Sequence, residues 1–110
     1  MRVPVTEYVD TLDLAGEDIR VRFRTERGRL VDFMVQYETT IDGRSYRVVR
    51  YDGSHGRAHR DELDGRGDTI RKVWLPEHLT LNEAFVVGRR DIETNWRRYR
   101  EAFRRRLGRA

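Results

Sequence analysis

The last third of the chain carries apolar residues at the spacing of an α-helix, and this run limits the possible folds more than any other feature. Successive members are 4, 3, 4, 4, 3, 4 and 4 residues apart, which puts them on one face of a helix. Thr80 and Glu83 form the capping box that starts such a helix, and Gly108 suits its end. We therefore expect one helix over 81–107. The members of the stripe are Leu81, Phe85, Gly88, Ile92, Trp96, Tyr99, Phe103 and Leu107.

The residues before this helix alternate between apolar and polar side chains, as half-buried antiparallel strands do. The alternation predicts strands at 19–24, about 31–40, 46–51 and 70–75. A short edge strand within 3–10 has less pattern behind it, because Pro4 interrupts it. The sequence thus predicts a single α+β domain over 1–110. Its sheet, at about 18–75, is an antiparallel meander of about four strands, with one long C-terminal helix packed on one face.

The predicted helix is longer than the predicted strands. It would run about 40 Å, whereas strands usually span about 17–20 Å. Either the helix bends near Gly88 or its end projects beyond the sheet. A projecting end with an aromatic stripe needs a partner, so a homodimer through the C-terminal helix is one expectation.

The composition excludes several classes of protein. No run of about 18 apolar residues is present, and the first residues lack the apolar segment of a signal peptide. With no cysteine, the chain has neither disulfides nor a thiolate metal site. We expect a cytoplasmic protein without a membrane partner.

The motif richest in chemistry is the stretch 50–61, RYDGSHGRAHRD, which holds two of the three histidines. Cleaving RNA without a metal requires a general base, a general acid and a cation near the phosphate. His55 and His59 suit the first two roles because their ordinary pKa lies near neutrality. Asp61 or Asp52 would orient an imidazole. The other candidates are Tyr51, to stack on a base or donate a proton, and Arg50, Arg57 and Arg60, to hold phosphate.

Two other interpretations use the same residues. His55, His59 and one carboxylate would make a two-histidine, one-carboxylate metal site. Gly53 and Gly56 disfavour the helix that gives this spacing its usual meaning, so we expect no metal and no cofactor. In the second interpretation the stretch is a structural hairpin loop between the strands at 46–51 and 70–75, which His59 and Asp61 fix by hydrogen bonds.

Positive charge gathers in the predicted helix. Residues 86–110 hold nine arginines and three acids, a net +6 in a chain whose total is +4. Arg97, Arg104 and Arg105 are therefore candidate contacts to RNA or another nucleic acid. Glu93 and Glu101 offset part of this charge through i, i+4 pairs, which also occur on helices without any ligand.

The chain resembles a group of small uncharacterised prokaryotic proteins with the signature RYDxxHGxxHRD. The match covers roughly residues 45–107 and includes Lys72 and the run Asp91-Ile92-Glu93-Thr94-Asn95-Trp96, followed by Tyr99 and Phe103. More distantly, it is similar to TumE-like toxin components of toxin–antitoxin pairs. Those proteins commonly carry Tyr-Asp-Asn and a His-x-His element, where this chain has Tyr51-Asp52-Gly53 and His55-x-x-x-His59. The resemblance implies a small antitoxin-like partner.

The leading hypothesis is therefore a toxin-like protein that acts on RNA, with a metal-independent ribonuclease activity at the two-histidine loop. The alternative is a non-enzymatic module for nucleic-acid binding or protein assembly. In that module the basic C-terminal helix makes the contacts and the histidine loop is structural.

Overall fold

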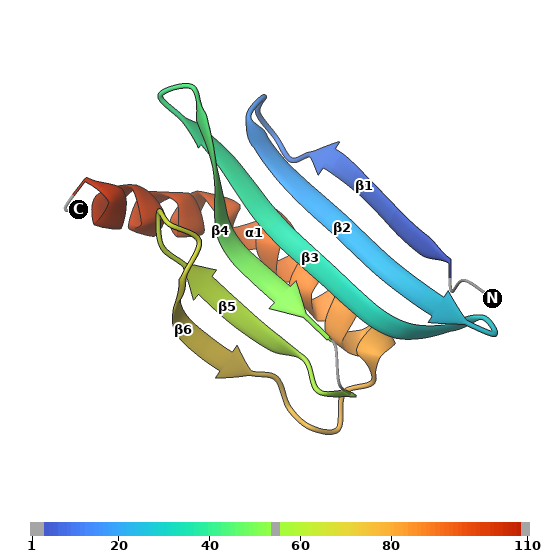
Figure 1. The fold of residues 1–110 in the computed structure, drawn as a ribbon. Helices are drawn as coiled ribbons and strands as arrows, with labels where there is room; N and C mark the ends of the chain where they lie inside the picture. Colours follow the sequence, from blue (N-terminus) through green and yellow to red (C-terminus); the bar gives the residue numbers. More distant parts are fainter. Residues whose placement is uncertain (1–3, 54–55, 109–110) are drawn as a thin grey trace.

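A meander of six antiparallel strands forms one sheet in the part of the chain that the computed structural model describes, residues 4–53 and 56–108 (Figure 1). Each strand pairs with its neighbours in the sequence, in the order β1-β2-β3-β4-β5-β6. One helix follows the sheet. The elements are β1 (Val5–Thr11), β2 (Glu17–Glu26), β3 (Arg29–Ile41), β4 (Arg44–Asp52), β5 (His59–Leu63), β6 (Thr69–Trp74) and α1 (Leu81–Leu107).

The α+β class and the long C-terminal helix are confirmed, but the number of about four strands is too low. β1 is the suggested edge strand, paired with β2 from Val5 to Thr11. β5 was expected to be loop. Its sequence, HRDEL, has one apolar residue, so hydrophobic alternation cannot reveal it. Hydrogen bonding to β4 on one side and β6 on the other makes it a strand.

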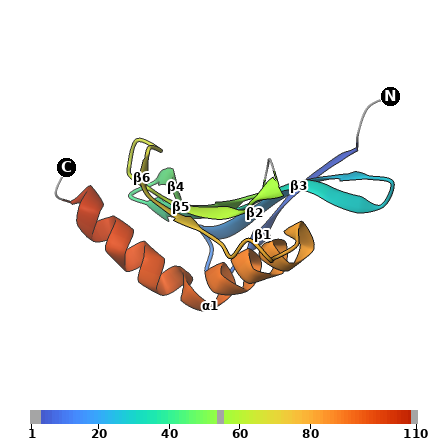
Figure 2. The same cartoon turned by 90° about the horizontal axis from the view of Figure 1, so that it is seen from below.

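The helix covers one face of the sheet and packs mainly on β3 and β4 (Figure 2). Aromatic pairs join the two layers: the ring of Trp96 lies 6.2 Å from that of Tyr37, and Phe103 lies 5.5 Å from Tyr46. The predicted stripe is therefore the core side of α1. Its buried members are Gly88, Ile92, Trp96, Tyr99 and Phe103.

The helix bends, with its convex side away from the sheet, and its last turns extend past the ends of the strands (Figure 2). Its last turn meets the turn between β5 and β6. There, Arg106 donates a hydrogen bond of 3.4 Å to the carbonyl oxygen of Leu63. A methyl carbon of Leu107 would lie 2.8 Å from a Cβ built on Gly65. The buried part of the stripe is thus covered within the chain, and the dimer through this helix stays a prediction.

Gly88 allows the helix to approach the sheet closely. A Cβ added there would lie 2.7 Å from Cγ of Tyr51, closer than two carbons can come. In the described part of the chain, no helix is both long and apolar enough to cross a membrane.

Candidate functional site

The two faces of the sheet divide the candidate residues into separate groups, because neighbouring residues of a strand point to opposite faces. On β4 and β5, Tyr51 pairs with Arg60, and Asp52 pairs with His59. The Tyr51 hydroxyl donates a hydrogen bond to Asp91 of α1, so Tyr51 and Arg60 face the helix. His59 therefore points to the opposite side, which we call the open face because none of the described elements covers it.

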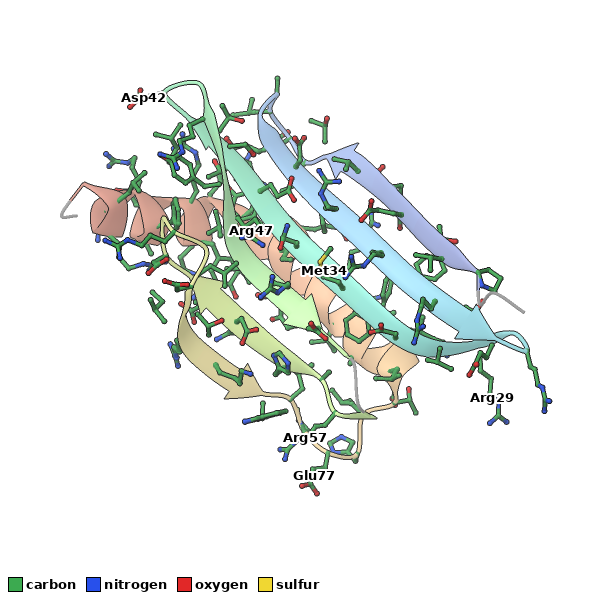
Figure 3. All side chains as sticks on the ribbon, in the orientation of Figure 1. Arg29, Met34, Asp42, Arg47, Arg57 and Glu77 are labelled. Carbon is green, nitrogen blue, oxygen red and sulfur yellow. The ribbon has the colours of Figure 1, made fainter. Side chains whose placement is uncertain are left out.

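His59 stands in a line of residues that crosses the open face. The strand registers pair Arg22 with Met34, Met34 with Asp52, Asp52 with His59, and His59 with Trp74. We call these five residues the His59 row. Since neighbouring strands lie about 4.8 Å apart, the row spans about 19 Å. Figure 3 views the sheet from this side, with Met34 near its centre.

A second row lies beside the first, shifted by two residues on each strand. It contains Arg20, Gln36, Arg50, Asp61 and Lys72, which the same registers pair in that order. We call it the Asp61 row. Asp61 therefore lies next to His59 on the same face. The alternation of β5, once the strand is known, brings these two predicted residues together.

The carboxylate of Asp61 joins His59 to Arg50. Its Oδ1 lies 3.3 Å from Nδ1 of His59, and its Oδ2 lies 3.9 Å from Nη2 of Arg50. The His59 side chain is 14% exposed and that of Asp61 is 6% exposed. Water therefore screens this cation–carboxylate–imidazole chain only partly.

Buried polar atoms without a hydrogen bond gather at this point. Among the described residues there are six such side-chain atoms, and four belong to the two rows: Oε1 of Gln36, Nε of Arg50, Nδ1 of His59 and Oδ1 of Asp61. Nδ1 of His59 and Oδ1 of Asp61 face each other at 3.3 Å, whereas Oε1 of Gln36 and Nε of Arg50 each cost about 1–3 kcal/mol if nothing pairs with them. A ligand or water that reached these atoms would recover part of that free energy.

Trp74 ends the His59 row at the edge strand β6. Its ring meets the His59 ring edge to face at 72°, with the centroids 5.1 Å apart, and the residue is 52% exposed. Nζ of Lys72 and Cζ of Arg57 lie 5.5 and 5.3 Å from the indole centroid. Arg57 also pairs with Glu77 at 3.2 Å, below the end of the strands in Figure 3. An exposed aromatic ring beside cations is the arrangement that single-stranded nucleic acids stack on.

On the other face, Tyr51 belongs to a half-buried polar cluster centred on Asp91. The carboxylate of Asp91 accepts hydrogen bonds from Tyr51 at 2.6 Å, from Asn95 at 2.7 Å, and from Tyr99. Burial, and next the hydrogen bond to Asp91, raise the pKa of both phenols, that of Tyr99 to about 12. Arg60 pairs with Glu62 at 3.4 Å on the same face. Neither Tyr51 nor Arg60 lies with His59.

The arginines of the helix also lie away from His59, with the sheet between them. Arg97 pairs with Asp13 and lies over the ring of Trp96. Arg104 and Arg105 both pair with Glu101, at 2.8 and 3.3 Å. The basic helix and the histidine motif therefore do not share a face.

Two motif residues, His55 and Asp52, and the metal-site interpretation complete the comparison with the sequence. His55 lies outside the described residues. Asp52 stands on the open face as the cross-strand partner of His59. In the described ranges, no group of three or more histidine, aspartate or glutamate side chains has the arrangement of a metal site.

Sequence reasoning missed the importance of Trp74 and Met34. Their signal was the alternation of each strand, which assigns every residue to a face. The faces of β4 and β6 could not be matched from the sequence, because β5, which sets the register between these two strands, was not predicted.

One family model, described as "Domain of unknown function (DUF7718)", matches residues 3–109 of the chain. No curated protein and no solved structure matches it.

Proposed function

We propose that the chain, which belongs to this family of domains of unknown function, is an RNA-directed, toxin-like protein that cleaves single-stranded RNA with His59. The proposal is based on the residues of the open face. The observation that carries the proposal is the position of His59. A carboxylate lies beside its Nδ1, and an exposed tryptophan flanked by cations lies beside its ring.

The reaction that this arrangement suits is attack of a ribose 2′-hydroxyl on the adjacent phosphate. Nε2 of His59 takes the hydroxyl proton while the 2′-oxygen bonds to phosphorus. The P–O5′ bond then breaks, leaving a 2′,3′-cyclic phosphate, and the departing oxygen takes a proton from water or from a second acid such as His55. Asp61 stabilises the imidazolium of His59, and Arg50 offsets negative charge on the phosphate.

Trp74 favours a single-stranded substrate over a duplex. Stacking of an unpaired base on an aromatic side chain contributes about 1–3 kcal/mol and is open to any base. In a duplex the bases are stacked on each other and are not available to this ring. The ribose 2′-hydroxyl, which the reaction needs, distinguishes RNA from DNA.

The test compares His59→Ala with His78→Ala, a matched change at an exposed histidine in the segment before α1. Purified wild type and His78→Ala should cleave a single-stranded RNA to 2′,3′-cyclic phosphate ends, and His59→Ala should lose at least about 100-fold in rate. On induction in cells, growth arrest should follow the same pattern. Equal cleavage by all three proteins would contradict the role of His59.

Binding is measured separately from cleavage with the fluorescence of tryptophan. Trp74 is exposed and Trp96 is 4% exposed, so quenching by RNA reports mainly on Trp74. His59→Ala should still show saturable quenching. Quenching without cleavage by the wild type would favour the non-enzymatic binding module, and the absence of both would reject RNA as the ligand.

A further inference from the structure

A polar hollow of about 350 Å³ lies on the open face next to the His59 row. Its position follows from the registers, because Met34 pairs with Asp52, and Asp52 pairs with His59. The hollow therefore begins one strand away from the imidazole, a distance of about 5 Å. Its lining residues are Val5, Arg22, Phe23, Arg24, Asp32, Phe33, Met34 and Asp52.

The charges of the hollow are arranged to receive a group that is itself both anionic and a hydrogen-bond donor. Arg22 makes no ion pair with any described residue, so its guanidinium is available to an anion. Arg24 pairs only loosely with Asp32, at 3.7 Å and with both side chains partly exposed. Asp32 therefore retains acceptor capacity for N–H groups.

The other surfaces of the hollow are apolar. Met34 contributes a thioether, which suits the flat face of a heterocycle. The Phe33 ring points the other way and packs on Phe85 of the helix. The volume lies at the small end of the range for ligand pockets, about 300–1,000 Å³, and fits one nucleotide rather than several.

We propose that this hollow binds a single guanine nucleotide of the RNA strand, adjacent to the phosphate at His59. Arg22 holds a phosphate of that nucleotide, and Met34 lies against the base. The carboxylate of Asp32 accepts from the neighbouring N1–H and N2–H₂ groups of guanine, which together match a carboxylate's two oxygens. This inference rests on the proposed function, since it takes the substrate to be RNA.

The chain offers one clean probe of the hollow. Its two methionines are Met1 and Met34, so a protein labelled with ¹³C at the methionine methyl groups gives two NMR signals, one of them from the hollow. Titration with 5′-GMP should shift the Met34 signal saturably. 5′-UMP should bind about tenfold more weakly because uracil offers a single N–H donor, and guanosine without phosphate should also bind more weakly.

Two variants and a control assign the contacts. Arg22→Gln should weaken 5′-GMP binding about tenfold through loss of the charged hydrogen bonds. Asp32→Asn should reduce the preference for 5′-GMP over 5′-UMP. Arg47→Gln is the matched control: Arg47 stands on the same face, away from the hollow (Figure 3), where it is the cross-strand neighbour of Glu38 but makes no ion pair with a described acid. It should leave binding unchanged.

The failure of this inference can be told apart from failure of the proposed function. If RNA is cleaved in a His59-dependent way but no nucleotide moves the Met34 signal, and Arg22→Gln has the KM of wild type, the nucleotide site is wrong and the ribonuclease stands. If 5′-GMP binds as expected but His59→Ala cleaves RNA like wild type, the site stands and the ribonuclease is wrong. Equal binding of 5′-GMP and 5′-UMP would overturn the choice of guanine.

Discussion

The hydroxyl of Tyr51 on β4 donates a hydrogen bond to the carboxylate of Asp91 on α1, over 2.6 Å. This contact joins the sheet to the helix at a point where Tyr99 and Asn95 bind the same carboxylate. It also settles where the tyrosine of the motif points. Tyr51 contributes to packing between the layers, while His59, eight positions later, stands on the other side of the sheet.

Tyr51→Phe should therefore weaken folding and leave catalysis unchanged. Loss of one hydrogen bond to a half-buried carboxylate should lower the free energy of unfolding by about 1.5–3 kcal/mol, measured by urea denaturation. The cleavage rate per folded molecule should match that of wild type. Tyr46→Phe is the control, because the described structure gives the Tyr46 hydroxyl no hydrogen bond and the ring keeps its contact with Phe103. A large loss of rate in Tyr51→Phe alone would return this residue to the active site.

Stability should fall at alkaline pH. The folded pKa of Tyr99 is about 12, raised by burial and then by Asp91, whereas a tyrosine in an unfolded chain titrates near pH 10. The folded state therefore holds this proton more tightly. The contribution of the protonated Tyr99 to the free energy of unfolding is complete below about pH 10 and is lost as the pH rises toward 12. Denaturation between pH 8 and pH 12 should show this loss, and Tyr99→Phe should show a smaller slope in the same range.

Gly88→Ala should destabilise the protein although alanine favours helices. The helix propensity alone predicts a gain of about 1 kcal/mol. The added Cβ, however, meets three atoms of the buried Tyr51 at 2.7–3.0 Å, and overpacking of this kind costs about 1–3 kcal/mol. The steric term should prevail, because the hydrogen bond to Asp91 restricts movement of the tyrosine. Thermal unfolding measures the effect. The control is Thr94→Ala, at an exposed position of the same helix, which should be neutral or slightly stabilising.

The open face, and not the helix, should determine how RNA binding depends on salt. Lys72→Gln removes a cation that lies beside Trp74 and makes no ion pair in the described structure. The substitution should make the slope of the logarithm of the RNA-binding constant against the logarithm of salt concentration shallower, by the amount that about one phosphate contact contributes. Arg105→Gln should leave the slope unchanged, because Arg105 is paired with Glu101 and lies on the helix, on the opposite side of the sheet from the open face. The reverse result would assign RNA to the helix.

Much of the fold could be predicted because its elements carry strong local signals. The stripe from Leu81 to Leu107 gave the helix its type and limits, and the Asp42-Gly43 turn has the positive φ angles of a tight hairpin. β5 could not be predicted in this way. Its polar residues on both faces form a strand only because hydrogen-bonding partners lie on either side.

That missing strand is also why the site was predicted only in part. His59, Asp61 and Arg50 were identified from their chemistry and do lie close together. Tyr51 and Arg60 were grouped with them because they are close in sequence, a criterion that fails in a strand, where adjacent residues point apart. Trp74 and Arg22 are far from the motif in sequence, and only the strand registers bring them into its row.

The rows have a consequence for how this chain can change over time. Its core and its candidate site use alternate residues of the same strands, and the alternation changes phase at the bulge in β4, so that Tyr46 and Tyr51 both face the helix. A one-residue shift of β5 against β4, with no bulge to absorb it, would turn His59 toward the helix and Arg60 toward the open face. The interior of each strand should therefore keep its length among homologues of this chain. Length variation should collect in turns such as 64–68, where side chains do not have to alternate between two faces.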